Sequence, residues 1–189
     1  PPTSPRTIFR FLHSADSAVC EKAVKACMAM IDFVAGTDTG IIIGFLKGGP
    51  SSNVQGPCER FSAALKRIAP HAKQKRVQVL IEATNRYEAA VANDLAATVD
   101  LVEPLGTDYV QILPDTFHMN IEEAQGPVAA LKRCNGYYQS VHISDNNRFF
   151  PGFGAIDFNS ILLSLKEMGY QGSMAIEGNI RNNFKEDVQ

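Results

Sequence analysis

The sequence predicts an α/β fold in which parallel strands and helices alternate and the sheet curves into a barrel. Two observations carry this prediction. Apolar, β-branched runs alternate along the chain with segments whose apolar residues recur at helical spacing. Four of the predicted strands also end in a carboxylate or an imidazole, and no glycine-rich phosphate-binding motif follows any strand, which disfavours an open dinucleotide-binding sheet.

The first quarter of the chain contains one predicted helix and one predicted strand. Residues 1–15 are expected to be irregular, with a short apolar patch at residues 8–12. A helix is expected over residues 16–34, because its apolar residues lie on one helical face, and Gly36 is expected to end it. Residues 41–46 are β-branched without polar alternation, which predicts a strand buried on both faces, as in a parallel sheet.

The next two βα units are predicted from the same alternation. Their segments, in order, are a loop (47–57), a helix (58–72), a strand (77–81), a helix (94–102) and a strand (109–113). The first of these strands ends at Glu82. The second leads to Asp115 and His118, which are expected in a strand-to-helix loop. The helix after that loop is expected to begin at Ile121, with Asn120 as its N-cap.

The last part of the chain continues the pattern. Its segments, in order, are the rest of that helix (to residue 134, with a break at 126–127), a strand (137–141), a long loop (144–156), a helix, a strand (173–176) and a frayed end (178–189). The two strands lead to His142 and Glu177, and the long loop holds Arg148. Asp157 is expected to cap the helix and Gly169 to end it. Four residues of this helix are expected to face inward: Ile161, Leu162, Leu165 and Met168.

Composition indicates a single globular domain over residues 1–189. The chain has 45% hydrophobic and 20% charged residues and a formal net charge of −2, which leaves no basic surface for nucleic acid or an anionic membrane. No run approaches the roughly 18 apolar residues of a membrane span. The four cysteines form no CxxC pair, which favours packing over zinc or redox chemistry and indicates a reducing compartment, here expected to be the cytoplasm.

A carboxylate or an imidazole follows each of four successive predicted strands, about one βα unit apart: Glu82, Asp115, His142 and Glu177. Parallel strands place all four at the same edge of the sheet, and the curvature of a barrel brings them together. Three carboxylates and one imidazole suit Mn²⁺, Mg²⁺ or Co²⁺ better than a structural zinc site, which uses cysteine. The sequence therefore predicts a shared divalent-metal site.

Each of these residues also has a plainer interpretation. Asp115 can serve only as a helix cap, and His142 as a core or capping histidine. Glu82 and Glu177 can be surface ion-pair partners. Each glutamate follows several apolar residues, however, so both are expected deep in the fold. A buried carboxylate without a cation is costly, and a bound divalent ion removes that cost.

The segments that contain these residues resemble a known family: residues 81–88, 113–123, 141–148 and 175–177. They are similar to the xylose isomerase-like TIM barrels and, within them, to the ketose 3-epimerases of the tagatose and psicose (allulose) type. The runs 85–88 and 115–123 are specific, whereas the last two segments are shared across the wider superfamily. The resemblance covers the chain from about residue 14 onward, and it implies a (β/α)8 TIM barrel present here as strands four to eight.

The resemblance also implies roles for individual residues. One divalent metal, with Mn²⁺ expected and Co²⁺, Mg²⁺ or Zn²⁺ as alternatives, would be held by Glu82, Asp115, His142 and Glu177. The sugar's hydroxyls would be contacted by Glu88, His118 and Arg148. Glu82 and Glu177 would also transfer protons on opposite faces of a metal-bound enediolate. The implied activity is that of an isomerase for sugars or sugar phosphates, most closely ketose 3-epimerisation, with a small sugar as the partner.

Length is the main departure from that family. Its barrels have about 250 residues and eight strands, whereas five strands are expected here. The domain is therefore expected to be incomplete at both ends, with two apolar sheet edges. The rest of a longer protein, or a partner chain as in a homo-oligomer, would cover those edges.

Other activities stay open at this point. Hydroxypyruvate-type isomerases and inosose dehydratases are the nearer alternatives, and residues 85–88 favour the epimerases over them. Abasic-site endonucleases share the fold but bind three metals with several more histidines, and this chain has four histidines in all, none in the 144–156 loop. An inactive fragment that only binds partners is the alternative of another class.

Overall fold

Five short parallel strands form the scaffold of the protein in a computed structural model, which describes residues 11–188. In chain order, these strands are β1 (Ile41–Ile43), β2 (Val79–Glu82), β3 (Val110–Leu113), β4 (Ser140–Ile143) and β5 (Ser173–Ile176). The first three form one sheet, and β4 pairs with β5. The His142 amide donates to the Pro114 carbonyl at 2.8 Å and so joins the two sheets. The strands thus follow one another in an open arc, which confirms the predicted α/β class with parallel strands.

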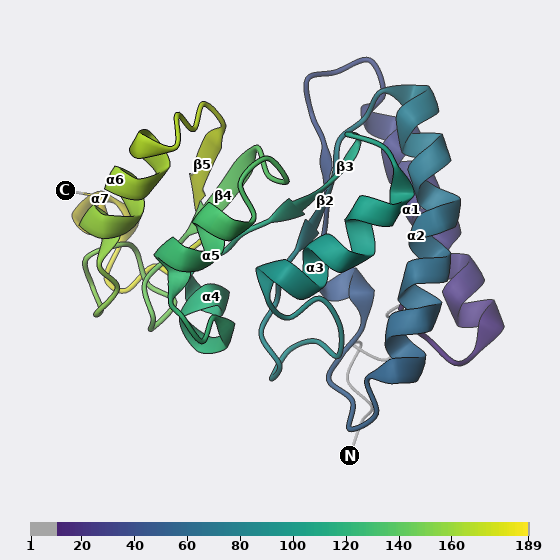
Figure 1. The fold of residues 1–189 in the computed structure, drawn as a ribbon, viewed down its shortest axis with the longest axis horizontal. Coiled ribbons are helices and arrows are strands. Elements are labelled where there is room, and N and C mark those ends of the chain that lie inside the picture. The colour runs from purple at the N-terminus through teal and green to yellow at the C-terminus, as the bar shows by residue number, and fades with distance from the viewer. Residues whose placement is uncertain (1–10, 189) are drawn as a thin grey trace.

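Helices alternate with these strands along the described chain. They are α1 (Ser17–Val34), α2 (Gln55–Lys75), α3 (Leu95–Val102), α4 (Thr116–Glu122), α5 (Pro127–Arg133), α6 (Phe158–Glu167) and α7 (Phe184–Asp187). Two short 3-10 turns, η2 (Phe45–Lys47) and η3 (Glu103–Leu105), follow β1 and α3. Figure 1 shows β2 and β3 beside α1 and α2 in one part of the molecule, and β4 and β5 near α6 and α7 in the other.

Asp157 caps α6, as the sequence predicts, and two further aspartates, Asp16 and Asp94, cap α1 and α3. Asp16, Asp94 and Asp157 accept hydrogen bonds from backbone amides in the first turns of α1, α3 and α6, at 2.8, 2.8 and 3.1 Å. A capping side chain of this kind contributes roughly 1 kcal/mol. These caps explain why the start of each helix agrees closely with the sequence prediction.

The main core lies between the first three strands and helices α1 and α2. The predicted inward residues of α2 are nearly or fully buried: Phe61, Leu65, Ile68 and Ala72. Fully burying a side chain the size of leucine or phenylalanine contributes about 1.5–3 kcal/mol. Cys27 of α1 is buried in the same core, and all four cysteines are free, which agrees with a packing role. Helix α2 is longer at both ends than the predicted 58–72.

Strand β1 is shorter than predicted and is not buried on both faces. It ends at Ile43, and the turn η2 follows where a continuation of the strand was expected. Ile41 and Ile43 are buried, whereas Ile42 on the opposite face is 46% exposed. The prediction was wrong because, in the described chain, no element covers the face of β1 that carries Ile42.

The helix after β3 begins earlier than predicted. Asp115, and not Asn120, is the N-cap of α4, and its Oδ1 accepts the Phe117 amide at 2.8 Å. His118 therefore lies within a helix and not in a loop. The expected break at residues 126–127 separates α4 from α5, because Pro127 has no amide hydrogen and suits the first position of a new helix.

Strand β5 is an edge strand in the described chain and all four of its residues are exposed, which agrees with the expected apolar sheet edge. The rest of the C-terminal part differs from the prediction in two respects. Leu162 of α6, expected to face inward, is 41% exposed. The segment expected to fray contains α7, and Asp187 of that helix accepts the Arg181 amide at 2.6 Å. This network of backbone contacts gave no periodic signal in the sequence.

Most of the apolar patch predicted at residues 8–12 lies outside the described residues. Leu12 is fully buried, and its amide donates to the Leu46 carbonyl at 3.0 Å, so the chain before α1 is anchored beside η2. None of the described helices combines the length and the apolar character that a membrane crossing needs.

Candidate metal centre

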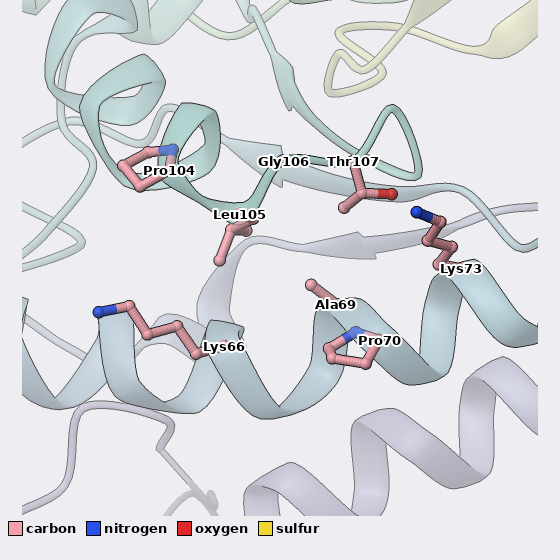
Figure 2. A pocket seen from close by; sticks show the side chains of 8 residues that line it. All are labelled: Lys66, Ala69, Pro70, Lys73, Pro104, Leu105, Gly106 and Thr107. Carbon is pink, nitrogen blue, oxygen red and sulfur yellow. The ribbon is translucent and has the colours of Figure 1, made fainter.

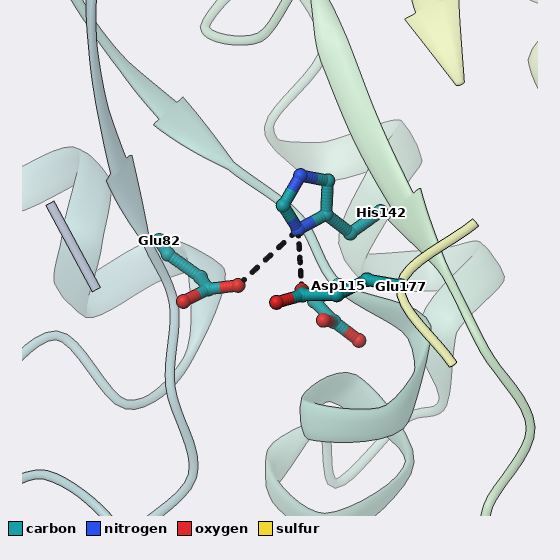
Figure 3. Close-up of side chains that lie close together, drawn as sticks. All are labelled: Glu82, Asp115, His142 and Glu177. Carbon is teal, nitrogen blue, oxygen red and sulfur yellow. Dashed lines mark hydrogen bonds and ion pairs between the residues drawn. The ribbon is translucent and has the colours of Figure 1, made fainter. Parts of the chain in front are cut away.

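The four residues predicted as metal ligands lie together at the carboxyl-terminal ends of the strands. Glu82 ends β2, and Asp115 follows β3. His142 lies within β4, and Glu177 follows β5. One potential ligand atom from each side chain lies within 4.8 Å of the others. Figure 3 shows the side chains converging from separate strands, as the barrel interpretation predicts.

His142 lies between two of the carboxylates. Its Nδ1 is 2.6 Å from Glu177 Oε2 and 3.4 Å from Glu82 Oε1, as the dashed lines in Figure 3 mark. Glu82 Oε1 is buried and has no hydrogen-bond partner in the described part of the chain. A buried polar atom without a partner costs about 1–3 kcal/mol. This oxygen is therefore one that a bound cation would satisfy.

Asp115 uses its two carboxylate oxygens differently. Oδ1 accepts the Phe117 amide and caps α4, whereas Oδ2 lies 2.6 Å from Arg148 Nη1. Arg148 Nη2 also lies 3.0 Å from Glu177 Oε2. The interpretation of Asp115 as a helix cap therefore accounts for only one of its oxygens, and the other belongs to the cluster.

Burial distinguishes the two glutamates. Glu82 is 7% exposed, so the interpretation as a surface ion-pair partner does not apply to it. The side chain of Glu177 is 47% exposed, because this residue follows the edge strand β5. The prediction that both glutamates lie deep in the fold was correct for Glu82 and wrong for Glu177.

The cluster shifts the pKa values of its members in opposite directions. Burial disfavours a charged imidazole, but the hydrogen bond to Glu177 and the ion pair with Glu82 outweigh it and raise the pKa of His142 to about 9. The hydrogen bond from His142, with further help from Arg148, lowers the pKa of Glu177 to about 2 against the effect of burial. Burial raises the pKa of Asp115 to about 7, although Arg148 opposes this shift. The metal-free cluster therefore holds protons that a cation has to displace.

Divalent-metal binding at this cluster is expected to release protons. A ring nitrogen binds a metal only without its proton, and at pH 8 His142 is protonated while Asp115 is mostly ionised. We expect about one proton per metal at pH 8, and an apparent affinity that rises about tenfold per pH unit towards the pKa of His142. Calorimetry in buffers of different ionisation enthalpy measures the proton count, and binding without proton release would contradict this charge state.

The raised pKa of His142 also makes the stability of the metal-free fold depend on pH. The partners of His142 stabilise its charged form, so this contribution is complete below its usual pKa of 6.5 and disappears as the pH rises through about 9. A metal would replace the proton and keep these carboxylates paired above that pH. The donor set of three carboxylates and one imidazole therefore fits a hard divalent cation.

The absence of a side chain at Gly44 leaves room for the Glu82 carboxylate. A β-carbon at this position would clash with Glu82 Oε2, because the end of β1 lies beside the end of β2. Gly44→Ala is expected to displace that carboxylate and to weaken Mn²⁺ binding about 10- to 100-fold. The matched control is Gly49→Ala, where a β-carbon meets nothing within 4 Å. If both variants bind Mn²⁺ equally well in a calorimetric titration, Glu82 does not hold the metal in this position.

Of the three residues expected to contact substrate, Arg148 touches this cluster directly. It pairs with two of the candidate ligands, and its guanidinium lies 4.9 Å from the centre of the Phe117 ring. His118 of α4 and Glu88 of the loop after β2 both accept from the amide of Asn85, at 2.8 and 2.9 Å. The structure thus links His118 and Glu88 to each other through Asn85.

Lys47 is a site residue that the sequence did not reveal. It was assigned to a loop, but it lies at the end of the turn η2 and is fully buried. Its ammonium donates to the Glu82 carbonyl and to Thr84 Oγ1, the latter at 2.9 Å. Burial lowers the pKa of Lys47 to about 7, although Glu82 and Glu88 oppose the shift. A lysine in a glycine-rich segment carries no signal of burial, so only the fold identifies this contact beneath Glu82.

Arg86 and Glu122 are a second feature that the sequence did not reveal. The Glu122 carboxylate accepts from the Arg86 backbone amide at 2.7 Å and from its guanidinium at 2.8–3.1 Å. A bidentate pair of this kind is geometrically specific. It fastens the loop after β2 to helix α4 and so joins the two segments on which the family resemblance is most specific.

A cavity of about 380 Å³ lies away from this cluster, between the C-terminal half of α2 and the segment that leads into β3. Figure 2 shows that its lining includes two lysines, Lys66 and Lys73, but no carboxylate or imidazole. It faces the amino-terminal ends of the strands, and in barrels of this type chemistry collects at the opposite ends. The cavity is therefore not part of the candidate site.

Comparison with known proteins agrees with the fold. The family model described as the xylose isomerase-like TIM barrel matches residues 3–189. The chain is 32% identical over 170 residues to the L-ribulose 3-epimerase of Mesorhizobium japonicum, and the alignment covers 88% of this chain and 57% of that protein. It is 33% identical over 129 residues to the 3-dehydro-D-guloside 4-epimerase of Escherichia coli, and this alignment covers 68% of this chain and 49% of that protein.

The architecture is also found in solved structures. The crystal structure of D-psicose 3-epimerase from Clostridium cellulolyticum H10 with D-tagatose has a TM-score of 0.80 to this chain at 26% sequence identity. The match covers 94% of this chain and 63% of that one. The chain therefore has the TIM-barrel fold as a partial barrel, and it spans about half the length of the curated relatives that it matches.

Proposed function

The chain belongs to the xylose isomerase-like TIM barrel family, and from this membership we propose that it takes part in the metal-dependent epimerisation of a ketose, at C3 in the first place. The single observation that carries the proposal is the convergence of three carboxylates and one imidazole within 4.8 Å at the ends of the strands. The names of the relatives support it, because they describe 3-epimerases of ribulose and psicose and a 4-epimerase of a related keto sugar.

In this proposal, the cation is Mn²⁺ and is held by Glu82, Asp115, His142 and Glu177. When bound, it would act as a Lewis acid that polarises the substrate carbonyl and offsets the negative charge that develops on the substrate oxygens. Two observations support this assignment: the buried Glu82 Oε1 has no hydrogen-bond partner among residues 11–188, and most of the potential ligand atoms are oxygens.

Glu82 and Glu177 would carry the proton transfers. They belong to different strand ends and approach His142 from separate sides, which suits work on two faces of a flat intermediate (Figure 3). One carboxylate would remove the proton from the carbon next to the carbonyl, and the C–H electron pair would move towards the carbonyl oxygen. The other would return a proton to the opposite face of that carbon and invert it.

Three further side chains would orient the sugar. Arg148 carries a fixed positive charge beside Asp115 and Glu177, so it would hold substrate oxygens close to the reacting carbon. His118 and Glu88 would hydrogen-bond hydroxyl groups further along the chain of the sugar. The family resemblance supports these roles, together with the contacts of Arg148 to the cluster and the connection of His118 to Glu88 through Asn85.

We also propose that the described arc is part of a single barrel domain whose other strands cover its open edges. Ile42 of β1 and both Met174 and Ile176 of β5 are about half exposed. Apolar side chains in edge strands are normally paired or covered, because an open edge promotes aggregation. Substrate choice would then depend on side chains from the covering strands as well as on those described here.

The proposed activity is tested by a substrate screen. Chelator-treated protein is loaded with Mn²⁺ and incubated in D₂O with fructose, tagatose, psicose and ribulose, each free and phosphorylated, and the products are separated by chromatography. The proposal predicts a C3 epimer that carries one deuterium at the inverted carbon. Mn²⁺-loaded protein that forms no epimer from any of these ketoses, or that forms an aldose in its place, would contradict it.

A further inference from the structure

Asn85 connects two of the residues that the proposed function places against the substrate. It is 1% exposed, and its Nδ2 lies 2.9 Å from Glu88 Oε1 and 2.8 Å from His118 Nδ1. Its Oδ1 accepts the Tyr87 backbone amide at 3.0 Å. One buried amide therefore joins the loop after β2 to helix α4, directly behind the proposed substrate contacts.

These contacts allow only one orientation of the Asn85 amide. The Tyr87 amide is a donor, so the atom that faces it is the oxygen Oδ1. The Glu88 carboxylate accepts, so the atom that faces it is Nδ2. The reversed amide would place an oxygen against a carboxylate oxygen and one N–H against another. Because Nδ2 has two hydrogens, it donates one to Glu88 and the other to His118.

We infer that Asn85 is a positioning residue that holds His118 as the neutral tautomer protonated at Nε2, so that His118 donates a hydrogen bond to a substrate oxygen. The nitrogen Nδ1 accepts from Asn85 and therefore carries no proton, which leaves the proton of the neutral ring on Nε2. Within residues 11–188, Nε2 has no hydrogen-bond partner, so its hydrogen is free for a ligand. This inference rests on the proposed function only for the identity of that ligand.

The surroundings of His118 support a neutral ring. His118 is 2% exposed, and this burial lowers its pKa to about 4. Lys47 and Arg148 add to the effect of burial, whereas Glu82 and Glu177 oppose it. A neutral donor at this position suits a carbonyl or hydroxyl oxygen of an uncharged sugar.

The side-chain amide of Asn85 also orients the Glu88 carboxylate as a hydrogen-bond acceptor for substrate. Since Asn85 uses one of its hydrogens on Glu88 Oε1, the other oxygen of that carboxylate stays available as an acceptor. His118 as donor and Glu88 as acceptor then form a complementary pair for neighbouring oxygens of a polyhydroxy ketone. The Arg86–Glu122 pair fastens the same loop to α4 and so supports the contact between Asn85 and His118.

The tautomer can be measured without any enzyme activity. Long-range ¹H–¹⁵N correlation spectra distinguish protonated from unprotonated ring nitrogens, and His118→Gln identifies the His118 signals by their loss. In the wild-type protein at pH 7, we expect Nε2 protonated and Nδ1 unprotonated. A wild-type His118 with its proton on Nδ1 would overturn the inference, whatever the variants do.

The variant Asn85→Asp tests whether Asn85 determines the tautomer of His118. The new carboxylate can only accept, so it should draw a proton onto His118 Nδ1 and remove the donor that faces the substrate. We expect protonation at Nδ1, KM for the ketose raised roughly 10- to 100-fold and an unchanged dissociation constant for Mn²⁺. The matched control is Asn93→Asp in the same loop, whose amide donates to the Thr84 and Ala89 carbonyls at 2.8 and 2.9 Å.

The outcomes separate this inference from the proposed function. A tautomer change in Asn85→Asp but not in Asn93→Asp supports the positioning role, even if the wild-type protein epimerises no ketose. The same change in both variants, or no change in either, would overturn it. If thermal unfolding shows that Asn85→Asp does not fold, two other measurements decide the question. One is the tautomer of His118 in the wild-type protein. The other is the variant Asn85→Ala, which should leave His118 Nδ1 without its donor and raise KM.

Discussion

Glu177→Gln is expected to lower kcat for ketose epimerisation by roughly 10²- to 10⁴-fold, which is the range that a general acid or base contributes. Glutamine keeps the size of the side chain and can still accept the hydrogen bond from His142 Nδ1, which is 2.6 Å long in the wild-type protein. It can neither take up nor return a proton at the reacting carbon. With Mn²⁺ supplied well above its dissociation constant for the variant, KM should change little, because the substrate contacts at His118 and Glu88 stay intact.

The same variant separates the two proton transfers. With Glu177 replaced, Glu82 can still remove a proton from one of the two epimers and return it on the same face. We therefore expect this epimer, and not the other, to exchange its proton at the inverted carbon with D₂O while epimerisation is nearly lost. NMR of both epimers in D₂O measures this exchange.

Glu167→Gln is the control for that variant. Within residues 11–188, the Glu167 carboxylate of α6 forms only an exposed ion pair with Lys132 of α5. The control should behave as the wild type. Epimerisation by Glu177→Gln at the wild-type rate would exclude Glu177 as an acid or base. Loss of exchange in both epimers would mean that Glu82 does not remove a proton on its own.

The second large effect concerns stability. Mn²⁺ at about 100 times its dissociation constant should raise the free energy of unfolding by about 2.7 kcal/mol, because the ligands converge only in the folded chain. For a domain of this size, that corresponds to a rise in Tm of roughly 5–10 °C. In Asp115→Asn, this metal-dependent rise should be lost, because one of the charged ligands is replaced by a neutral amide.

Asp115→Asn is informative because the fold should survive it. Asparagine is as good an N-cap as aspartate, so the bond from the Phe117 amide to Oδ1 can persist. Asp157→Asn is the matched control: it changes the cap of α6 in the same way but lies outside the cluster. Thermal unfolding with and without Mn²⁺ checks both variants, and an undiminished rise in Asp115→Asn would show that Asp115 does not bind the metal.

The convergence of the ligand set could be predicted from the sequence because it depends on topology. Alternating helices and strands imply parallel βα units, and parallel strands place Glu82, Asp115 and His142 at the same edge. That inference needs only the order of the elements and not their exact ends. It therefore remained correct although β1 is shorter and α4 begins earlier than predicted.

The supporting contacts could not be predicted, because they depend on side chains that meet across loops. Lys47 beneath Glu82 and Asn85 beside His118 both lie in segments whose composition indicates exposed loops. Their burial follows because the turn after β1 packs against the loop after β2, and that loop packs against α4. The exposure of Ile42 and Glu177 was missed for a related reason, since an apolar strand shows no sign in its own sequence of whether a neighbour covers it.

The measurement that tests the central claim most directly is a calorimetric titration of the chelator-stripped protein with Mn²⁺. The convergence of Glu82, Asp115, His142 and Glu177 predicts one site of micromolar or tighter affinity, and that site should be lost in Asp115→Asn but not in Asp157→Asn. The absence of binding in a protein whose thermal unfolding shows it to be folded would contradict the metal site, and with it the proposed chemistry.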